Sequence, residues 1–426
     1  MMRHPVDQTA TNDKHMPKVS IDRLALLLLI LATALVSGCA TPATTFYNGP
    51  IPLLGTPGTL IRQEPLGRSP EGGRAYRIVY LSTLGDGSLV PVSGLVIVPS
   101  QPAPSGGRPV IAWAHPTTGV QAQCAPSLSP LRFLMIPGLK DMLRNGYVVA
   151  ATDYPGLGTG RVHPFLDGAS EGRAVLDSVR AAAAIPEAMT ARHYALWGHS
   201  QGGQAVLFAG SLAASYTPEL RLAGVAAAAP ATDLATLFRD DLGTAGGNNL
   251  TALTLWAWAR FYGANYSSVV QPAATPAIEA VANSCIDSLI KRPSKRRADA
   301  TLASTFLSVP DMTSIEPWRS LIKRNSVQPL PPTVPVFLAQ GGADVIVRPA
   351  VTYSFAQRLC AGGSRLQLTV VPGTGHSWIA MRTASAAVNW MGDRFKGALA
   401  PNDCSQLPQL TAGATWSNPV QPQRGE

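Results

Sequence analysis

A serine with glycines two positions before and after it could act as a nucleophile, and the chain contains this pattern as GHSQG at residues 198–202. With 39 glycines in 426 residues, the pattern alone is weak evidence. Its surroundings strengthen it, because a strand-like apolar run at 194–197 precedes the serine and a helix of small residues at 201–214 follows it. A strand, a sharp turn and a helix form the elbow that exposes a nucleophilic serine above a sheet. We therefore predict that Ser200 is a nucleophile, with an idle serine in a glycine-rich turn as the alternative.

A serine nucleophile needs a histidine to remove its proton and an acid to orient that histidine. In the fold built around such an elbow, the acid and then the histidine follow the serine, each just beyond a later strand. Asp344 follows the strand-like run 334–339, and His376 follows the run 366–371. The sequence therefore predicts a triad of Ser200, Asp344 and His376.

Other acids and histidines fit these roles less well. Asp233 and Asp311 fall in or beside a long insertion, so we expect surface or capping roles for them. His199 adjoins the serine but points elsewhere from such a turn, and His193 begins a predicted strand. Both histidines are therefore expected to be structural.

The backbone near the serine could bind a developing negative charge. In an elbow, one donor is the N–H of the residue after the nucleophile, here Gln201. A second donor is expected from the loop HPTTG at residues 115–119, which follows the first short buried strand. Because Pro116 has no N–H, Thr117 or Thr118 is the candidate, with a plain turn as the alternative.

Short apolar runs alternate with helix-like segments over most of the chain after residue 107. Such alternation is typical of an α/β fold with a mostly parallel sheet and helices on both faces. The predicted strands are a hairpin of 76–82 and 92–98, followed by 110–114, 147–152, 194–197, 222–228, 334–339 and 366–371. The predicted helices include 170–184, 201–214 and a final helix marked by Val388, Met391 and Phe395. We assign the core to residues 72–230 and 331–404.

Residues 231–330 do not continue this alternation. They are too many for a loop and contain a helix at 250–262 that is apolar nearly all round, so we predict a helical cap inserted before the last two strands. Trp256, Trp258 and Phe261 lie on that helix, where they could line an acyl pocket or pack the cap itself.

The N-terminus has the features of an export signal, with basic residues before the apolar run 24–36. This run is shorter than the about 20 residues that span a bilayer, so we predict that residues 1–38 are a signal peptide. The segment LVSGC at 35–39 resembles the lipobox of bacterial lipoproteins, which predicts lipidation of Cys39 and attachment to a membrane of the cell envelope. An ordinary cleavage site followed by secretion is the alternative.

Two further segments are expected to lie outside the core. Residues 39–71 are rich in Pro and Gly and predict a tether followed by an irregular N-terminal wrap. Residues 405–426 are expected to form a C-terminal tail.

Charge and cysteine content argue against several classes of function. The net charge is only +9, and the one dense basic run, 291–297, is expected to be a solvated face, so no nucleic-acid partner is predicted. Without Cys39 the five cysteines become four, an even number that permits two disulfides. None has the C-x-x-C spacing of zinc or redox sites, and neither a metal nor another cofactor is predicted. A monomer is expected.

The chain resembles the secretory lipases typified by fungal lipase A. The resemblance covers nearly all of the mature chain and rests on PGTLIR at 57–62, SGLVIVP at 93–99, GHSQGG at 198–203, Asp344 and His376. It implies an α/β-hydrolase fold with a helical cap, and hydrolysis of acyl esters through an acyl-enzyme intermediate.

The same resemblance implies two disulfides, Cys124 with Cys285 and Cys360 with Cys404. The sequence departs from the fungal members in its predicted lipid anchor, in its short tail after Cys404 and in its Pro116-Thr117-Thr118 loop. These differences concern the choice of substrate more than the chemistry.

Together these features predict a serine carboxylic-ester hydrolase, a lipase or carboxylesterase that acts on a lipid or a small ester. An aminopeptidase or other amide hydrolase would use the same triad, but it would need an anchor for the substrate amine that the sequence does not reveal. A non-catalytic binding lipoprotein would usually have lost one triad residue, and none is missing.

Overall fold

The computed structural model describes Met1, residues 45–286 and residues 293–407. The predicted signal peptide, Cys39 and most of the predicted C-terminal tail lie outside these ranges. All elements described below belong to the unit Ala43–Glu426.

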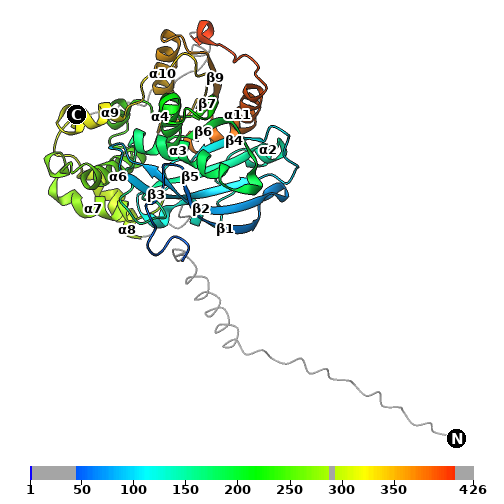
Figure 1. Ribbon diagram of the computed structural model, residues 1–426. Coiled ribbons are helices and arrows are strands. Elements are labelled where there is room, and N and C mark those ends of the chain that lie inside the picture. The colour runs from blue at the N-terminus through cyan, green and yellow to red at the C-terminus, as the bar shows by residue number, and fades with distance from the viewer. Residues whose placement is uncertain (2–44, 287–292, 408–426) are drawn as a thin grey trace. The chain divides into compact units, whose positions relative to one another are not determined.

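The strands of the described residues form one sheet in the order β1-β2-β3-β5-β4-β6-β7-β8-β9 (Figure 1). The pairs β1–β2, β2–β3 and β3–β5 are antiparallel, and all pairs from β5 to β9 are parallel. The strands are β1 (Leu60–Arg68), β2 (Arg74–Thr83), β3 (Leu89–Val98), β4 (Arg108–Ala114), β5 (Val148–Pro155), β6 (Thr190–His199), β7 (Arg221–Ala228), β8 (Val336–Gly341) and β9 (Leu366–Val371). This topology confirms the predicted α/β-hydrolase fold, including its antiparallel hairpin of β2 and β3.

The central strands are buried on both faces, which explains why they read as unbroken apolar runs. On β4, Val110 and Ala112 join the apolar cluster on one face of the sheet, whereas Ile111 and Trp113 join the cluster on the other. Helices cover both faces: α3 (Gly168–Ala183), α4 (Gln201–Tyr216) and α10 (Pro349–Ala361) pack on the Val110 side, and α2 (Leu139–Arg144) and α11 (Ile379–Phe395) pack on the Ile111 side.

The expectation of an irregular wrap was wrong for residues 60–68, because they form the edge strand β1. Pro65 and Gly67 hide this strand in the sequence, but proline is tolerated at a sheet edge, and the register of β1 shifts between Pro65 and Arg68. The chain just before β1 is also held, because the Gly58 N–H donates to the Leu81 carbonyl at 2.7 Å.

In the described part of the chain, five α-helices lie between β7 and β8, which confirms the predicted helical insertion before the last two strands (Figure 1). These cap helices are α5 (Leu234–Asp240), α6 (Ala245–Phe261), α7 (Thr275–Ala282), α8 (Pro293–Ser304) and α9 (Trp318–Asn325). No helix in the described part of the chain is both long and apolar enough to cross a membrane.

Two disulfides cross-link the described residues, and they are the pairs that the family resemblance implied. Cys124 pairs with Cys285, which joins the loop after β4 to the chain that follows α7. Cys360 pairs with Cys404, which ties the end of α10 to the C-terminal segment.

Replacing both Cys124 and Cys285 by alanine should lower the free energy of unfolding more than replacing Cys360 and Cys404. The first pair is separated by 161 residues and the second by 44, so the first removes more entropy from the unfolded chain. The expected losses are about 5 and about 4 kcal/mol. Urea denaturation of the two double variants measures both losses, and a larger loss from the second pair would contradict this explanation.

Candidate active site

Ser200 lies in the sharp turn between β6 and α4, with φ 58° and ψ −116°. This conformation is unusual for a residue with a side chain and costs about 1–3 kcal/mol. The turn is held by the Ser200 N–H, which donates to the Ala228 carbonyl on β7 at 2.9 Å. Glycines make it possible, since a Cβ at Gly198 would lie 2.1 Å from the Gly202 oxygen and a Cβ at Gly202 would lie 2.0 Å from the Ala114 oxygen. The structure thus forms the elbow that the sequence pattern predicted.

The three side chains expected to form a triad are hydrogen-bonded in series. His376 Nδ1 donates to Asp344 Oδ2 at 2.7 Å. With the proton on Nδ1, a neutral ring accepts at Nε2, and the Ser200 hydroxyl donates to this nitrogen at 2.8 Å. Asp344 is buried and His376 is partly exposed. In this arrangement the serine can pass its proton to the imidazole.

Backbone groups fix the Asp344 carboxylate. Its Oδ1 accepts hydrogen bonds from the N–H groups of Ile346 and Val347, both at 2.9 Å. Its Oδ2 accepts from His376 and, at 3.4 Å, from the side-chain amide of Gln340. Both oxygens of this buried carboxylate are therefore paired, which holds it in one orientation toward the imidazole.

His199 supports the triad from the side. Its Nε2 donates to the carbonyl oxygen of His376 at 3.0 Å, and the two rings lie 4.9 Å apart between centroids. Burial, followed by the nearby imidazole of His376, lowers the pKa of His199 to about 3, so its ring stays neutral. His199 thus positions the backbone of His376, in agreement with the structural role expected for it.

The two rival acids have the capping roles that the sequence analysis expected. Asp233 accepts from the Thr236 N–H at 3.1 Å and caps the start of α5. Asp311 accepts from the Thr313 N–H at 2.8 Å in a short turn between α8 and α9.

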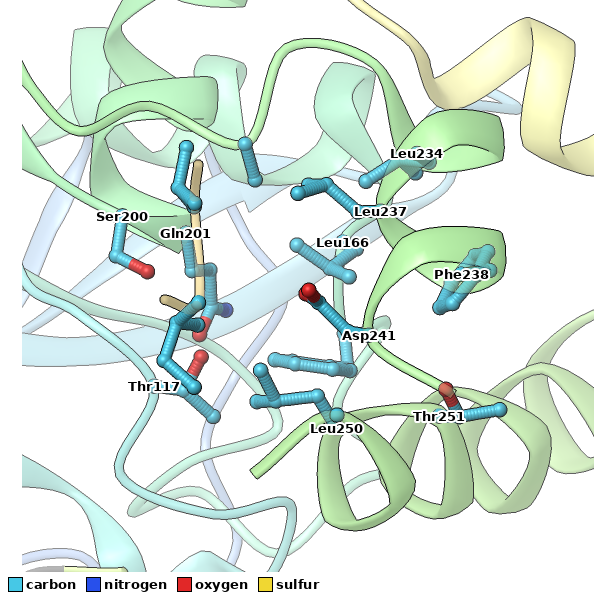
Figure 2. Close-up of a pocket in the computed structure, with 15 residues that line it drawn as sticks. Thr117, Leu166, Ser200, Gln201, Leu234, Leu237, Phe238, Asp241, Leu250 and Thr251 are labelled. Atoms are coloured by element: carbon cyan, nitrogen blue, oxygen red, sulfur yellow. The ribbon is translucent and has the colours of Figure 1, made fainter. Parts of the chain in front are cut away.

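A pocket of about 40 Å³ lies between the elbow and the cap helices (Figure 2). Ser200, Gln201 and Thr117 form one wall, and residues of α5 and α6 form the opposite wall. The lining is mostly apolar: Phe165, Leu166, Ala231, Leu234, Leu237, Phe238, Leu250, Ile346 and Val347 contribute, together with Asp241, Gly247 and Thr251. The pocket is therefore suited to a hydrocarbon chain.

The two oxyanion candidates from the loop after β4 are placed differently. Thr117 lines the pocket beside Ser200 and Gln201. Thr118 is not among the lining residues, and its side chain is buried. Its carbonyl accepts from the Ile286 N–H at 2.8 Å, which joins this loop to the chain after α7.

The aromatic residues considered for the acyl pocket do not line it. Trp258 is fully buried in the cap, where its ring stacks on Trp318 at 6.2 Å between centroids and its Nε1 donates to the Phe165 carbonyl at 2.8 Å. Trp256 donates from Nε1 to Glu279 at 2.8 Å, and Phe261 packs on the ring of Tyr262. The contacts that these three side chains make are those of cap packing, which was the alternative role predicted for them.

The face of α6 that meets the pocket lies earlier on the helix. Gly247, Leu250 and Thr251 are spaced i, i+3, i+4 and share that face. Helical periodicity alone gave no reason to prefer this face, because residues 250–262 are apolar nearly all round.

A buried polar network that the sequence analysis missed holds the side chain of Gln201. Gln201 Nε2 donates to Glu171 Oε1 at 2.7 Å and lies 3.2 Å from Nε2 of His163. His163 donates from Nδ1 to the Pro155 carbonyl at 2.9 Å, so its Nε2 is an acceptor. Glu171 Oε1 also accepts from the Leu166 N–H at 2.9 Å.

Burial keeps this network neutral. It lowers the pKa of His163 to about 3 and raises the pKa of Glu171 well above its ordinary value. Positions 163 and 171 carry no local pattern that links them to residue 201, so only the fold reveals the contact.

A model of the family described as secretory lipase matches residues 133–402, a span that includes Ser200, Asp344 and His376. The chain belongs to the secretory lipase family.

This secretory lipase family member has relatives of more than one kind. It is 25% identical over 369 residues to a probable inactive lipase of Mycobacterium tuberculosis (strain CDC 1551 / Oshkosh), covering 80% of this chain and 79% of the relative. It is 26% identical over 371 residues to a secreted triacylglycerol lipase of Malassezia globosa, covering 80% and 76%. A structure of Candida antarctica lipase A in its closed state matches with a TM-score of 0.70 at 17% identity, over 87% of this chain and 94% of that one, which supports the fold.

The described residues of this secretory lipase family member contain no group of three or more His, Cys, Asp and Glu side chains that could hold a metal ion.

Glu171→Gln should flatten the pH dependence of stability in this secretory lipase family member. The folded-state pKa of Glu171 is raised above its ordinary 4.5, so its contribution to stability is present below pH 4.5 and is lost as pH rises through the folded-state value. Glutamine keeps the Oε1 acceptor but does not titrate. As pH rises above 4.5, the wild type should therefore lose stability relative to the variant.

Urea unfolding at pH 5, 6.5 and 8 measures this difference, and Glu187→Gln, at an exposed position, is the matched control. Parallel pH profiles for the wild type and Glu171→Gln would contradict a neutral Glu171 in the folded protein.

Proposed function

We propose that this chain is a serine carboxylic-ester hydrolase that acts through Ser200, His376 and Asp344. The observation that carries the proposal is the hydrogen-bonded series from the Ser200 hydroxyl through the imidazole to the buried carboxylate, beside an apolar pocket. Membership of the secretory lipase family agrees with this chemistry.

The geometry supports acyl transfer in two steps. Ser200 Oγ attacks the ester carbonyl carbon while His376 Nε2 takes its proton, and the bond to the alcohol oxygen then breaks as that proton passes to the leaving alcohol. Water attacks the acyl-enzyme, His376 takes a proton from it and returns a proton to Ser200 Oγ, and the carboxylic acid leaves. Asp344 holds the Nδ1 proton and stabilises the imidazolium that forms in each step.

The oxyanion formed in each step needs hydrogen-bond donors directed at the former carbonyl oxygen of the ester. The N–H of Gln201 suits this role, because it belongs to the first turn of α4, whose N–H groups have no partner within the helix. Thr117, which lines the same wall, is the second candidate donor. Its loop is braced by the Tyr154 hydroxyl, which donates to the His115 carbonyl at 2.9 Å.

The apolar lining favours a lipid or a small ester as the substrate.

A non-catalytic binding role is the second candidate, because one relative is named a probable inactive lipase. The intact series of Ser200, His376 and Asp344 favours catalysis, since a binding protein has no need to retain all three groups in hydrogen-bonding positions.

Ser200→Ala should reduce ester hydrolysis by at least about 1,000-fold, because it removes the nucleophile and leaves only the oxyanion site and binding. The measurement is kcat/KM on p-nitrophenyl esters from acetate to palmitate. Ser211→Ala is the matched control: this serine lies on the same helix, donates to the Leu207 carbonyl and is not a pocket residue, so its variant should retain activity.

Equal rates for the wild type and Ser200→Ala on every ester would overturn the esterase proposal. If p-nitroanilides were cleaved instead, the amide hydrolase alternative would replace it.

We infer that the chain is exported and anchored through Cys39. Membership of the secretory lipase family suggests export, and the LVSGC segment at residues 35–39 supports a lipid-modified N-terminus. Mass spectrometry of the mature N-terminus should find a diacylated peptide that begins at Cys39. An unmodified peptide that begins beyond Cys39 would show secretion without an anchor.

A further inference from the structure

One acidic side chain stands out in the apolar pocket beside Ser200. Asp241 directly follows α5 and is the only ionisable residue among the described residues that line the pocket. It is 4% exposed, and its Oδ1 has no hydrogen-bond partner among the described residues. Figure 2 shows the carboxylate directed into the pocket, toward the wall formed by Thr117 and Gln201.

The neighbouring cation Arg348 does not supply the missing hydrogen bond to Asp241 Oδ1. Arg348 Nε lies 3.8 Å from Asp241 Oδ1, which is beyond hydrogen-bonding distance. The same guanidinium donates from another nitrogen to the backbone carbonyl of Asp240 at 2.6 Å. Arg348 is therefore held by the backbone and leaves Asp241 able to bind a group in the pocket.

The surroundings also determine the charge of this carboxyl. Burial raises the pKa of Asp241 to about 7, with Arg348 opposing the rise and Asp240 and Asp344 adding to it. Near neutral pH the group is thus present in both protonation states, and it can accept or donate a hydrogen bond.

A buried carboxyl oxygen without a hydrogen-bond partner is costly unless a bound molecule supplies one. A plain hydrocarbon chain in this pocket would displace water from Asp241 and leave it unpaired, whereas a hydroxyl group would both donate to and accept from it. Sites built to bind a hydroxyl discriminate strongly against the analogue that lacks it.

We propose that Asp241 is a specificity-determining residue and that the pocket binds an ester whose buried chain carries a hydroxyl group. This inference rests on the proposed ester hydrolysis at Ser200 and adds the substrate class. The hydroxyl can belong to the acyl chain or to the alcohol chain, since both meet at the serine.

The test compares hydroxylated and plain esters of equal length in a pH-stat assay at pH 7. The acyl arm pairs methyl 3-hydroxybutanoate, 6-hydroxyhexanoate and 8-hydroxyoctanoate with methyl butanoate, hexanoate and octanoate. The alcohol arm pairs 4-hydroxybutyl and 6-hydroxyhexyl acetate with butyl and hexyl acetate. The wild type should prefer the hydroxylated member of at least one pair by about 10-fold or more in kcat/KM.

Three variants separate binding from structure. Asp241→Leu should abolish the preference, whereas Asp241→Asn, which can still hydrogen-bond, should retain a preference. Asp240→Asn is the matched control, because Asp240 is adjacent and lies 3.8 Å from Arg348 but does not line the pocket, so it should behave as the wild type. Thermal unfolding of each variant shows that the fold is intact.

A ratio near one for every wild-type pair, or the same ratio in Asp241→Leu as in the wild type, would overturn the inference while ester hydrolysis itself remains. Loss of the preference in Asp240→Asn would also overturn it, since the effect would then belong to the charge around Arg348. Faster hydrolysis of methyl 6-aminohexanoate than of methyl 6-hydroxyhexanoate would overturn it in another way, because it would show that Asp241 binds an ammonium group rather than a hydroxyl group. If Ser200→Ala hydrolysed the plain esters as fast as the wild type, the proposed function itself would be refuted.

Discussion

The site depends on one close approach between backbones, where the first turn of α4 meets the end of β4. A side chain at Gly202 would collide with the Ala114 carbonyl, so the two segments can touch only because the residue is glycine. This contact sets Ser200 and Gln201 beside the loop that begins at His115. The groups proposed to attack the ester and to bind its oxyanion thus come from the connections after β4 and β6, which meet at the carboxyl ends of these two strands.

Buried polar groups around the turn fix the other side chains of the site. The Asp344 carboxylate is fixed by two backbone N–H groups, and the His376 backbone is held by His199. Behind the elbow, Gln201 is held by Glu171, whose neutral form is favoured by burial. Hydrogen bonds thus hold these side chains in place, whereas the pocket residue Asp241 has an Oδ1 without a hydrogen-bond partner among the described residues.

The sequence predicted those parts of the molecule that follow from local pattern and chain order. Strands buried on both faces read as apolar runs, and the order of Ser200, Asp344 and His376 after successive strands indicated the three side chains that the fold brings together. Edge strand β1 was missed because Pro65 and Gly67 resemble breakers. The tryptophans of α6 could not be assigned, because a large aromatic side chain fits a core and a pocket equally well.

Polar residues that act through burial were beyond local reasoning. Glu171 and Asp241 look like surface acids in the sequence, and only the tertiary packing gives them their environment. The disulfide between Cys124 and Cys285 and the Ile286–Thr118 hydrogen bond fasten the chain after α7 to the loop after β4. Such a disulfide does not persist where thiols are kept reduced. In a reducing compartment, noncovalent contacts alone would hold this part of the cap to that loop.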